Sequence, residues 1–264
     1  MPASAWDCSF DFHSLSCRHS FNSFDMLHQK MEATAELKAL SKIERRRLYP
    51  RITNPNFLVL RSRRIIFQSW INSIEGNNLR ILDIGGRYQP YRSLFGNRVG
   101  KYVACDILKT ELVDVIGSGE VLPFASNTFD VVIATQVFEY FAQPQRAAEG
   151  IYDALKPGGV LLMSVASLAP RFVDEELWRF TSGGVRATLA QFRTVEVMPE
   201  TSSLGGLLRT ANLGLHTFTH FSMLRKLYEI TVCPCLNLAG MALEYARFTQ
   251  NDQFAPNYCV LAVK

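Results

Sequence analysis

The chain has 264 residues, of which 48% are hydrophobic and 20% are charged. These fractions lie near those of globular proteins, so the chain can bury a sizeable core and disorder of the whole is excluded. A formal net charge of +4 is too small to indicate a nucleic-acid partner. The length suits one decorated α/β domain, because length sets only a soft expectation for the number of domains.

The first 78 residues divide into two parts by composition. Residues 1–30 mix aromatics, serines and histidines without a period, and we expect a poorly ordered extension there. Good helix formers predict a helix over residues 31–47, which Pro50 terminates, and a second helix over residues 57–74. Residues 31–78 are therefore expected to form a helical segment ahead of the main domain.

A basic cluster lies within this helical segment. Its members are Lys42, Arg45, Arg46, Arg47, Arg51, Arg61, Arg63 and Arg64, opposed only by Glu44. Such a cluster suits an anionic substrate, a lipid surface or a phosphate backbone. A solvated helix face is the more frequent explanation, and it is the one we favour.

The cysteines and the N-terminus bear on metal binding and location. Cys105 and Cys259 fall in predicted buried strands, which favours reduced thiols and a cytoplasmic location. No metal is expected, because the histidines and cysteines near the N-terminus fit no standard zinc spacing. They are Cys8, His13, Cys17 and His19.

The start of the sequence lacks the pattern of a signal peptide. The apolar segment at residues 230–243 is too short to span a bilayer.

From residue 79 onward, short β-rich runs alternate with helical patterns, which indicates a parallel sheet covered by crossover helices. The predicted strands are residues 79–84, 102–105, 113–116, 129–134, 160–165, 194–198 and 258–263. The central runs are continuously apolar, as expected of strands buried on both faces. An apolar helical insertion is predicted at about 201–257, so that residues 79–264 form one domain.

The end of the first strand carries the first sign of a ligand site. Leu82-Asp83-Ile84-Gly85-Gly86 enters a turn before a helix predicted to start near Pro90. Glycine there lets a ligand approach the backbone, and ligands of open α/β sheets bind at the carboxyl ends of strands. A plain strand-to-helix turn is the alternative reading of this run.

Asp106 ends the second strand, roughly 20 residues later, where a carboxylate can accept hydrogen bonds from ribose hydroxyls. This arrangement suits NAD as well as S-adenosylmethionine (SAM). The dinucleotide fingerprint G-x-G-x-x-G is incomplete, however, because Arg87 and Gln89 stand in the turn. The turn therefore favours SAM.

Five ordered motifs resemble class I SAM-dependent methyltransferases, and more narrowly their small-molecule type 11 branch. They are Leu82-Asp83-Ile84-Gly85-Gly86 with Asp106, Glu120-Val121-Leu122-Pro123-Phe124, Phe129-Asp130-Val131-Val132, Glu139-Tyr140 and Leu155-Lys156-Pro157-Gly158-Gly159. The resemblance covers roughly residues 79–192. It implies an α/β fold with a Rossmann-like, doubly wound and mostly parallel seven-stranded sheet, an N-terminal helical extension and a helical insertion before the last strand.

The resemblance also implies SAM as the cofactor and places its contacts on particular residues. The cofactor-binding candidates are Asp83, Gly85, Gly86, Arg87, Asp106, Ile107, Ser118, Gly119 and Thr135. Two departures are visible: the family usually has an acid where Ser118 stands and favours glycine where Arg87 and Gln89 stand. Arg87 could pair with the methionine carboxylate, reach the acceptor or face solvent.

On the acceptor side, Glu139, Tyr140 and Asp174 are the candidate catalytic residues. The family commonly has histidine where Tyr140 stands, which removes one general base. Further candidates for the base are Glu175, His216 and His220. The spacing of His216 and His220 also suits a metal pair, but a packed or surface role is the better expectation.

A Trp-Arg-Phe-Thr run at Trp178, Arg179, Phe180 and Thr181 resembles the border of the acceptor pocket in many of these enzymes. A structural reading is equally open, in which Thr181 caps a helix, Trp178 packs and Arg179 pairs with an acid. A helix is expected to begin directly after the fourth strand, within residues 135–140, and Val137 and Phe138 are expected to pack against the sheet.

The sequence therefore predicts a methyltransferase acting on an oxygen, less readily a nitrogen, of a sugar, a glycan precursor or a small metabolite. A non-catalytic SAM-fold binding or scaffold protein is the first alternative, and an NAD-dependent oxidoreductase is the second. The apolar insertion could be a lid, a dimer face, a peripheral membrane contact or ordinary core helices. The oligomeric state stays open.

Overall fold

The computed structural model describes residues 41–171, 173–246 and 251–264. The expectations for residues 1–30, including the histidines and cysteines there, lie outside the described residues, as does the first part of the helix predicted over residues 31–47. Residues 41–48 are helical. The second predicted helix is confirmed as α2 (Phe57–Ser73).

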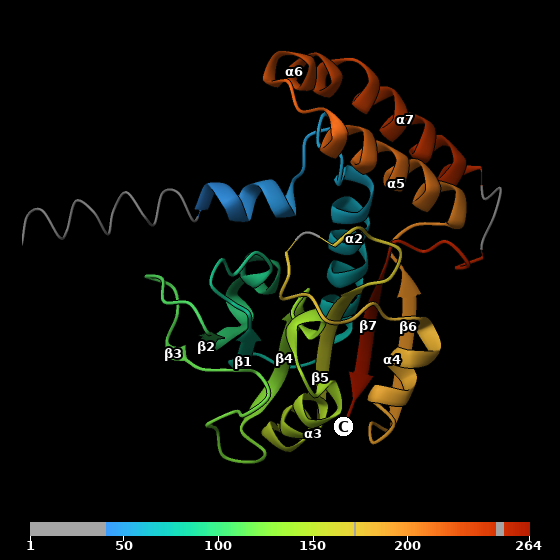
Figure 1. Ribbon diagram of the computed structural model, residues 1–264. Helices are drawn as coiled ribbons and strands as arrows, with labels where there is room; N and C mark the ends of the chain where they lie inside the picture. Colours follow the sequence, from blue (N-terminus) through green and yellow to red (C-terminus); the bar gives the residue numbers. More distant parts are fainter. Residues whose placement is uncertain (1–40, 172, 247–250) are drawn as a thin grey trace, which may run out of the picture.

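A seven-stranded sheet is the centre of the described chain, in the order β3-β2-β1-β4-β5-β7-β6 (Figure 1). The strands are β1 (Leu79–Ile84), β2 (Val99–Asp106), β3 (Val115–Ile116), β4 (Phe129–Thr135), β5 (Leu155–Ala166), β6 (Thr194–Pro199) and β7 (Asn257–Val263). The first five pair in parallel, whereas β7 runs antiparallel to β5 and β6. All seven predicted strands are confirmed, and so is the doubly wound, mostly parallel class.

Both faces of the sheet are covered, because successive side chains of a strand point to opposite sides. Leu82 and Ile84 of β1 join a core that contains Ile151 of α3 (Pro144–Ala154). Ile81 joins a second core with Phe67 of α2. The short helix α4 (Ser182–Thr188) packs on the α3 side. Burial on both faces explains why the central strands read as continuous apolar runs.

Two helix predictions near the strand ends are wrong. The helix expected near Pro90 is replaced by the 3-10 segment η1 (Arg92–Arg98), which is interrupted at Gly96 with φ 57°. The helix expected directly after β4 is reduced to η2 (Phe138–Tyr140). Gln89 and Gln136 have φ values of 44° and 52°, in the left-handed region that breaks a right-handed helix.

The predicted insertion is helical, as expected, and consists of α5 (Ser203–Phe218), α6 (Ser222–Ile230) and α7 (Val232–Tyr245). Its two ends leave the sheet at the carboxyl end of β5, since β7 starts at Asn257 opposite Ala166. The three helices lie together beyond that end of the sheet, beside α2 (Figure 1). Among the described residues, none of the helices has both the length and the apolar character needed to cross a bilayer.

A buried ion pair joins α2 to the point where the chain leaves β6. Arg63 Nε and Nη2 donate to Glu200 Oε1 and Oε2 at 2.5 and 3.0 Å, and both side chains are buried. Glu200 Oε2 also accepts from Asn257 Nδ2 at 2.8 Å. Because charged groups inside a protein are costly without partners, this three-way contact fixes α2, the insertion and β7 to one another.

Glu200→Gln is expected to lower the free energy of unfolding by about 3–5 kcal/mol, because Arg63 would keep its charge without its partner. Chemical denaturation measures this loss. Glu196→Gln, at an exposed position of β6, is the matched control and should change stability by about 0.5 kcal/mol at most. Equal stability of the two variants would show that the pair does not hold α2 in place.

Candidate functional site

Three segments predicted to bind the cofactor meet at the carboxyl ends of the parallel strands. The amide of Gly85 donates to the carbonyl oxygen of Cys105 at 2.8 Å, so the turn after β1 is joined to the end of β2. The amide of Gly117 donates to the carbonyl oxygen of Asp106 at 3.0 Å, which brings the loop containing Ser118 to the same place. Backbone contacts therefore gather residues that are far apart in the sequence.

Two glycines in this arrangement are required by space or backbone geometry. Gly85 has φ 74°, a conformation that residues with a side chain rarely adopt. A Cβ on Gly119 would lie 2.6 Å from both Ile84 Cγ2 and Phe141 Cζ. Gly119 therefore lets its loop lie directly against Ile84 at the end of β1 and against Phe141.

Asp106 supplies the acceptor expected for a ribose. Its side chain is buried at the end of β2, and its Oδ1 accepts from the amide of Leu108 at 2.9 Å. Ile107, the next residue, is 70% exposed although it is apolar. A carboxylate beside an exposed aliphatic side chain and a glycine loop matches the chemistry of an adenosine, which presents hydroxyls and a flat apolar ring. Thr135 ends the neighbouring strand β4.

Asp83 lies beneath this edge rather than at the surface. It is 2% exposed and accepts a hydrogen bond from the Tyr102 hydroxyl at 2.7 Å. Burial raises the pKa of Asp83 to about 7, while the Tyr102 hydrogen bond opposes that rise. Sequence reasoning missed Tyr102; the available signal is its place in β2, opposite Ile81 and close to Asp83 of β1.

The two positions that depart from the family pattern have local partners. The guanidinium of Arg87 lies 5.2 Å from the centre of the Tyr88 ring. Ser118 Oγ accepts from the amide of Glu120 at 3.2 Å, so this oxygen shapes its own turn. A cavity of about 490 Å³ opens beside this region and is bordered by Tyr88, Gln89 and Tyr102 among others.

The three candidate catalytic residues differ in their surroundings. Glu139 is 2% exposed, and its Oε1 accepts from the amide of Ala166, while its Oε2 has no partner in the described chain. Burial raises the pKa of Glu139 to about 7. The Tyr140 hydroxyl is 3.4 Å from Glu176 Oε1, and the side chain is exposed. Asp174 forms an exposed ion pair with Arg171 at 2.8 Å.

The loop that carries the Trp-Arg-Phe-Thr run is held at the same edge. The amides of Leu177 and Trp178 donate to the carbonyl oxygen of Glu139 at 2.7 and 3.2 Å. Arg179 pairs with Glu176, and the Thr181 hydroxyl caps α4 by accepting from the amide of Gly184 at 3.0 Å. The structural reading of Arg179 and Thr181 is therefore confirmed, and it leaves the loop beside Tyr140.

The histidines of the insertion stay away from this edge. His216 Nε2 lies 2.9 Å from Glu229 Oε1, so its ring is engaged between α5 and α6. His220 follows the end of α5 in an exposed stretch. No group of three histidine, cysteine or acidic side chains suited to a metal occurs in the described parts of the chain.

The raised pKa values predict that stability falls as the pH rises. Between about pH 4 and pH 7, Asp83 is ionised in the unfolded chain but keeps its proton in the folded chain. Ionisation therefore stabilises the unfolded state, and the free energy of unfolding falls as the pH rises through this range. Asp83→Asn should flatten this dependence in urea unfolding at pH 5 and pH 8. Asp153→Asn, at an exposed position of α3, should keep the wild-type slope. A wild type equally stable at both pH values would contradict the pKa of Asp83.

Comparison with known proteins shows which proteins this part of the chain resembles. The family model described as a methyltransferase domain matches residues 82–163. An uncharacterized methyltransferase of Mycolicibacterium gilvum is 30% identical over 99 residues, which are 33% of this chain and 39% of that protein. The mitochondrial arginine-hydroxylase NDUFAF5 of Homo sapiens is 34% identical over 92 residues, covering 31% of this chain and 27% of that protein.

Other similarities are longer and weaker. The ubiquinone/menaquinone biosynthesis C-methyltransferase UbiE of Cereibacter sphaeroides is 24% identical over 174 residues, 54% of this chain and 70% of that protein. A SAM-dependent methyltransferase structure from Archaeoglobus fulgidus is 13% identical with a TM-score of 0.49, covering 76% of this chain and 94% of that one.

This chain spans less than half of the length of either of the first two relatives. The matched residues run from the end of β1 to β5 and include Gly85, Asp106 and Gly119. Over residues 82–163, the chain is therefore similar to the methyltransferase domain family.

Proposed function

We propose that the chain is a SAM-dependent methyltransferase that moves a methyl group to an oxygen, less readily a nitrogen, of a sugar, a glycan precursor or a small metabolite. The observation that carries the proposal is the meeting of the Gly85 turn, Asp106 and the Gly119 loop at one sheet edge, joined by backbone hydrogen bonds. This edge lies inside the residues matched by the family model.

The residues of the edge have separate tasks in cofactor binding. We assign the ribose hydroxyls to the Asp106 carboxylate, the adenine to Ile107 and the Ser118–Gly119 loop, and the methionine part to the turn after β1. Bound SAM supplies a methyl group already activated by a sulfonium. The protein then has mainly to place the acceptor in line with that group and to exclude water.

On the acceptor side, we assign Tyr140 and the loop around Trp178 to the border of the pocket. Glu139 holds this loop through its backbone oxygen and ties it to β5 through its carboxylate. Since Glu139 is buried, we propose that it positions this loop and that Tyr140, which is exposed, meets the acceptor. An aromatic ring there can face the cationic sulfonium.

The oxygen acceptor rests on the resemblance to the small-molecule branch. The printed names of two relatives describe different chemistry, a C-methyltransferase in quinone biosynthesis and an arginine hydroxylase. The shared core therefore supports a cofactor class more directly than an acceptor atom. A cytoplasmic location likewise stays a proposal, in keeping with the buried free thiols of Cys105 and Cys259.

A non-catalytic SAM-binding protein is a second candidate. It is favoured by the absence of the family's histidine at Tyr140 and by the engagement of Asp174 in an exposed ion pair with Arg171. Neither observation affects the ribose and adenine contacts. The two candidates therefore share cofactor binding and differ in methyl transfer.

Isothermal titration should show saturable binding of SAM, and Asp106→Ala should weaken it about tenfold or more, because two charge-assisted hydrogen bonds to the ribose would be lost. Asp153→Asn is the control for a carboxylate change at a distance from the edge. Preferential binding of NADH would favour the oxidoreductase, and a lack of SAM heat in the wild type would remove the cofactor assignment.

Methyl transfer itself is tested with isotope-labelled SAM and a panel of hydroxylated and amine-containing acceptors, analysed by mass spectrometry. We expect label in an acceptor, and a much slower rate for Tyr140→Ala than for Tyr140→Phe, because the aromatic ring is the part assigned to the pocket. SAM binding without transfer to any acceptor of the panel would favour the non-catalytic candidate.

A further inference from the structure

The helix α6 turns its apolar stripe away from the protein. Met223, Leu227 and Ile230 are spaced four and three residues apart, so they line one side of the helix. Their exposed fractions are 79%, 53% and 68%. No residue of α6 is buried within the described structure. A helix packed on a protein core normally points such a stripe inward, so the orientation of α6 is reversed.

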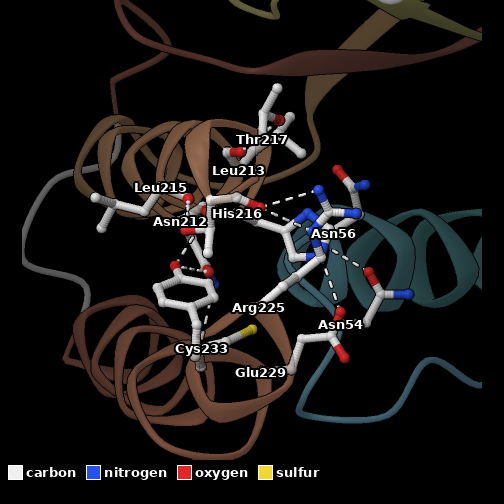
Figure 2. A network of polar contacts seen from close by, with 12 residues as sticks. Asn54, Asn56, Asn212, Leu213, Leu215, His216, Thr217, Arg225, Glu229 and Cys233 are labelled. Atoms are coloured by element: carbon white, nitrogen blue, oxygen red, sulfur yellow. Dashed lines mark hydrogen bonds and ion pairs between the residues drawn. The ribbon is translucent and has the colours of Figure 1, made fainter. Parts of the chain in front are cut away.

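The polar side of α6 makes its contacts with the rest of the insertion. The Tyr228 hydroxyl donates to Asn212 Oδ1 at 2.5 Å, and Glu229 lies 2.9 Å from His216 Nε2 of α5. Figure 2 shows Asn212 and His216 gathered with Arg225 and Glu229 between the helices. Specific polar contacts therefore fix which side of α6 faces outward.

The turn between α5 and α6 extends this apolar surface. Phe218 and Phe221 are 78% and 73% exposed, and Leu224 is also exposed. The α6 apolar face consists of Phe218, Phe221, Met223, Leu224, Leu227 and Ile230. The helix α6 itself lies at the end of the insertion that is farthest from the sheet (Figure 1). Apolar side chains that protrude from such an end can enter the boundary between lipid headgroups and acyl chains, which requires no preformed groove.

The charges of the insertion complement an anionic surface. The carboxylates of its three helices are engaged, Glu229 with a histidine and Glu244 with the Thr201 hydroxyl and, at 3.9 Å, with Arg61 Nη1. Lys226 is exposed on α6 itself. A cation therefore accompanies the apolar face, while the carboxylates are turned to internal partners.

Part of the basic cluster lies next to the same helices. Asn237 of α7 donates to the carbonyl oxygens of Ile52 and Asn54 at 2.6 and 3.0 Å. The carbonyl oxygen of Ile52 also lies 4.0 Å from the sulfur of Cys233, in the first turn of α7 directly after α6. Arg51, which precedes this contact, is exposed. The backbone that follows the exposed Arg51 is thus held against the start of α7, next to the end of α6.

We propose that the α6 apolar face docks on a membrane whose surface carries anionic phospholipid headgroups. The apolar side chains enter the boundary between headgroups and acyl chains, and Lys226 and Arg51 meet the phosphates. This arrangement combines apolar burial with electrostatic attraction, as interfacial helices do. The proposal does not depend on methyl transfer, because docking requires neither cofactor nor acceptor.

Vesicle flotation of the full chain tests the proposal, with phosphatidylcholine vesicles that contain or lack phosphatidylglycerol. The wild type should float with the anionic vesicles and much less with the neutral ones, and added salt should weaken binding. The double variant Leu227→Glu, Ile230→Glu should bind the anionic vesicles at least about tenfold more weakly than the wild type, since two apolar anchors become charged. Ile65→Glu, an equivalent change at an exposed position of α2, should bind like the wild type.

Other results would overturn docking on anionic lipid. They are no flotation of the wild type, equal binding to both vesicle types, or normal flotation of the double variant. A concentration-dependent dimer that the double variant abolishes, without vesicle binding, would assign the face to a second copy of the chain. Circular dichroism checks the helices of each variant. If the double variant unfolds, Phe218→Ser, at the end of α5, takes its place with the same expected loss.

Discussion

The buried ion pair between Arg63 and Glu200 holds together the parts of the chain that surround the sheet. Arg63 comes from α2, the helix before β1, and Glu200 from the point where the insertion begins. Asn257, at the start of the last strand, completes the contact. Since a buried charge without its partner is strongly unfavourable, this pair fixes α2 and the insertion to one end of the sheet.

That end of the sheet is also where the candidate cofactor site lies. Parallel strands bring their carboxyl ends to the same edge of the sheet. The residues that follow β1, β2 and β4 therefore lie close together although they are far apart in the sequence. The left-handed turn at Gly85 and the close approach of Gly119 to Ile84 and Phe141 shape the backbone at this edge. The site is thus built largely from main chain, and its buried acids, Asp83 and Glu139, lie beneath or beside it.

The insertion adds a different kind of surface to this scaffold. Asn212, His216, Tyr228 and Glu229 satisfy one another between the helices, so polar groups occupy the inside of the insertion. The apolar side of α6 is left outside as a consequence. The same chain therefore combines an α/β sheet with a helical addition that presents apolar side chains outward.

The sequence by itself determined the sheet, because apolar runs buried on both faces are a local and unambiguous pattern. It also placed Gly85, Asp106 and Gly119 at strand ends, since motif order and parallel topology imply that position. It failed where the outcome depended on distant contacts or on left-handed residues such as Gln89 and Gln136, which shortened two predicted helices. Only the tertiary structure decided the burial of Glu139, the pairing of Arg63 with Glu200 and the outward face of α6, because each depends on partners remote in the chain.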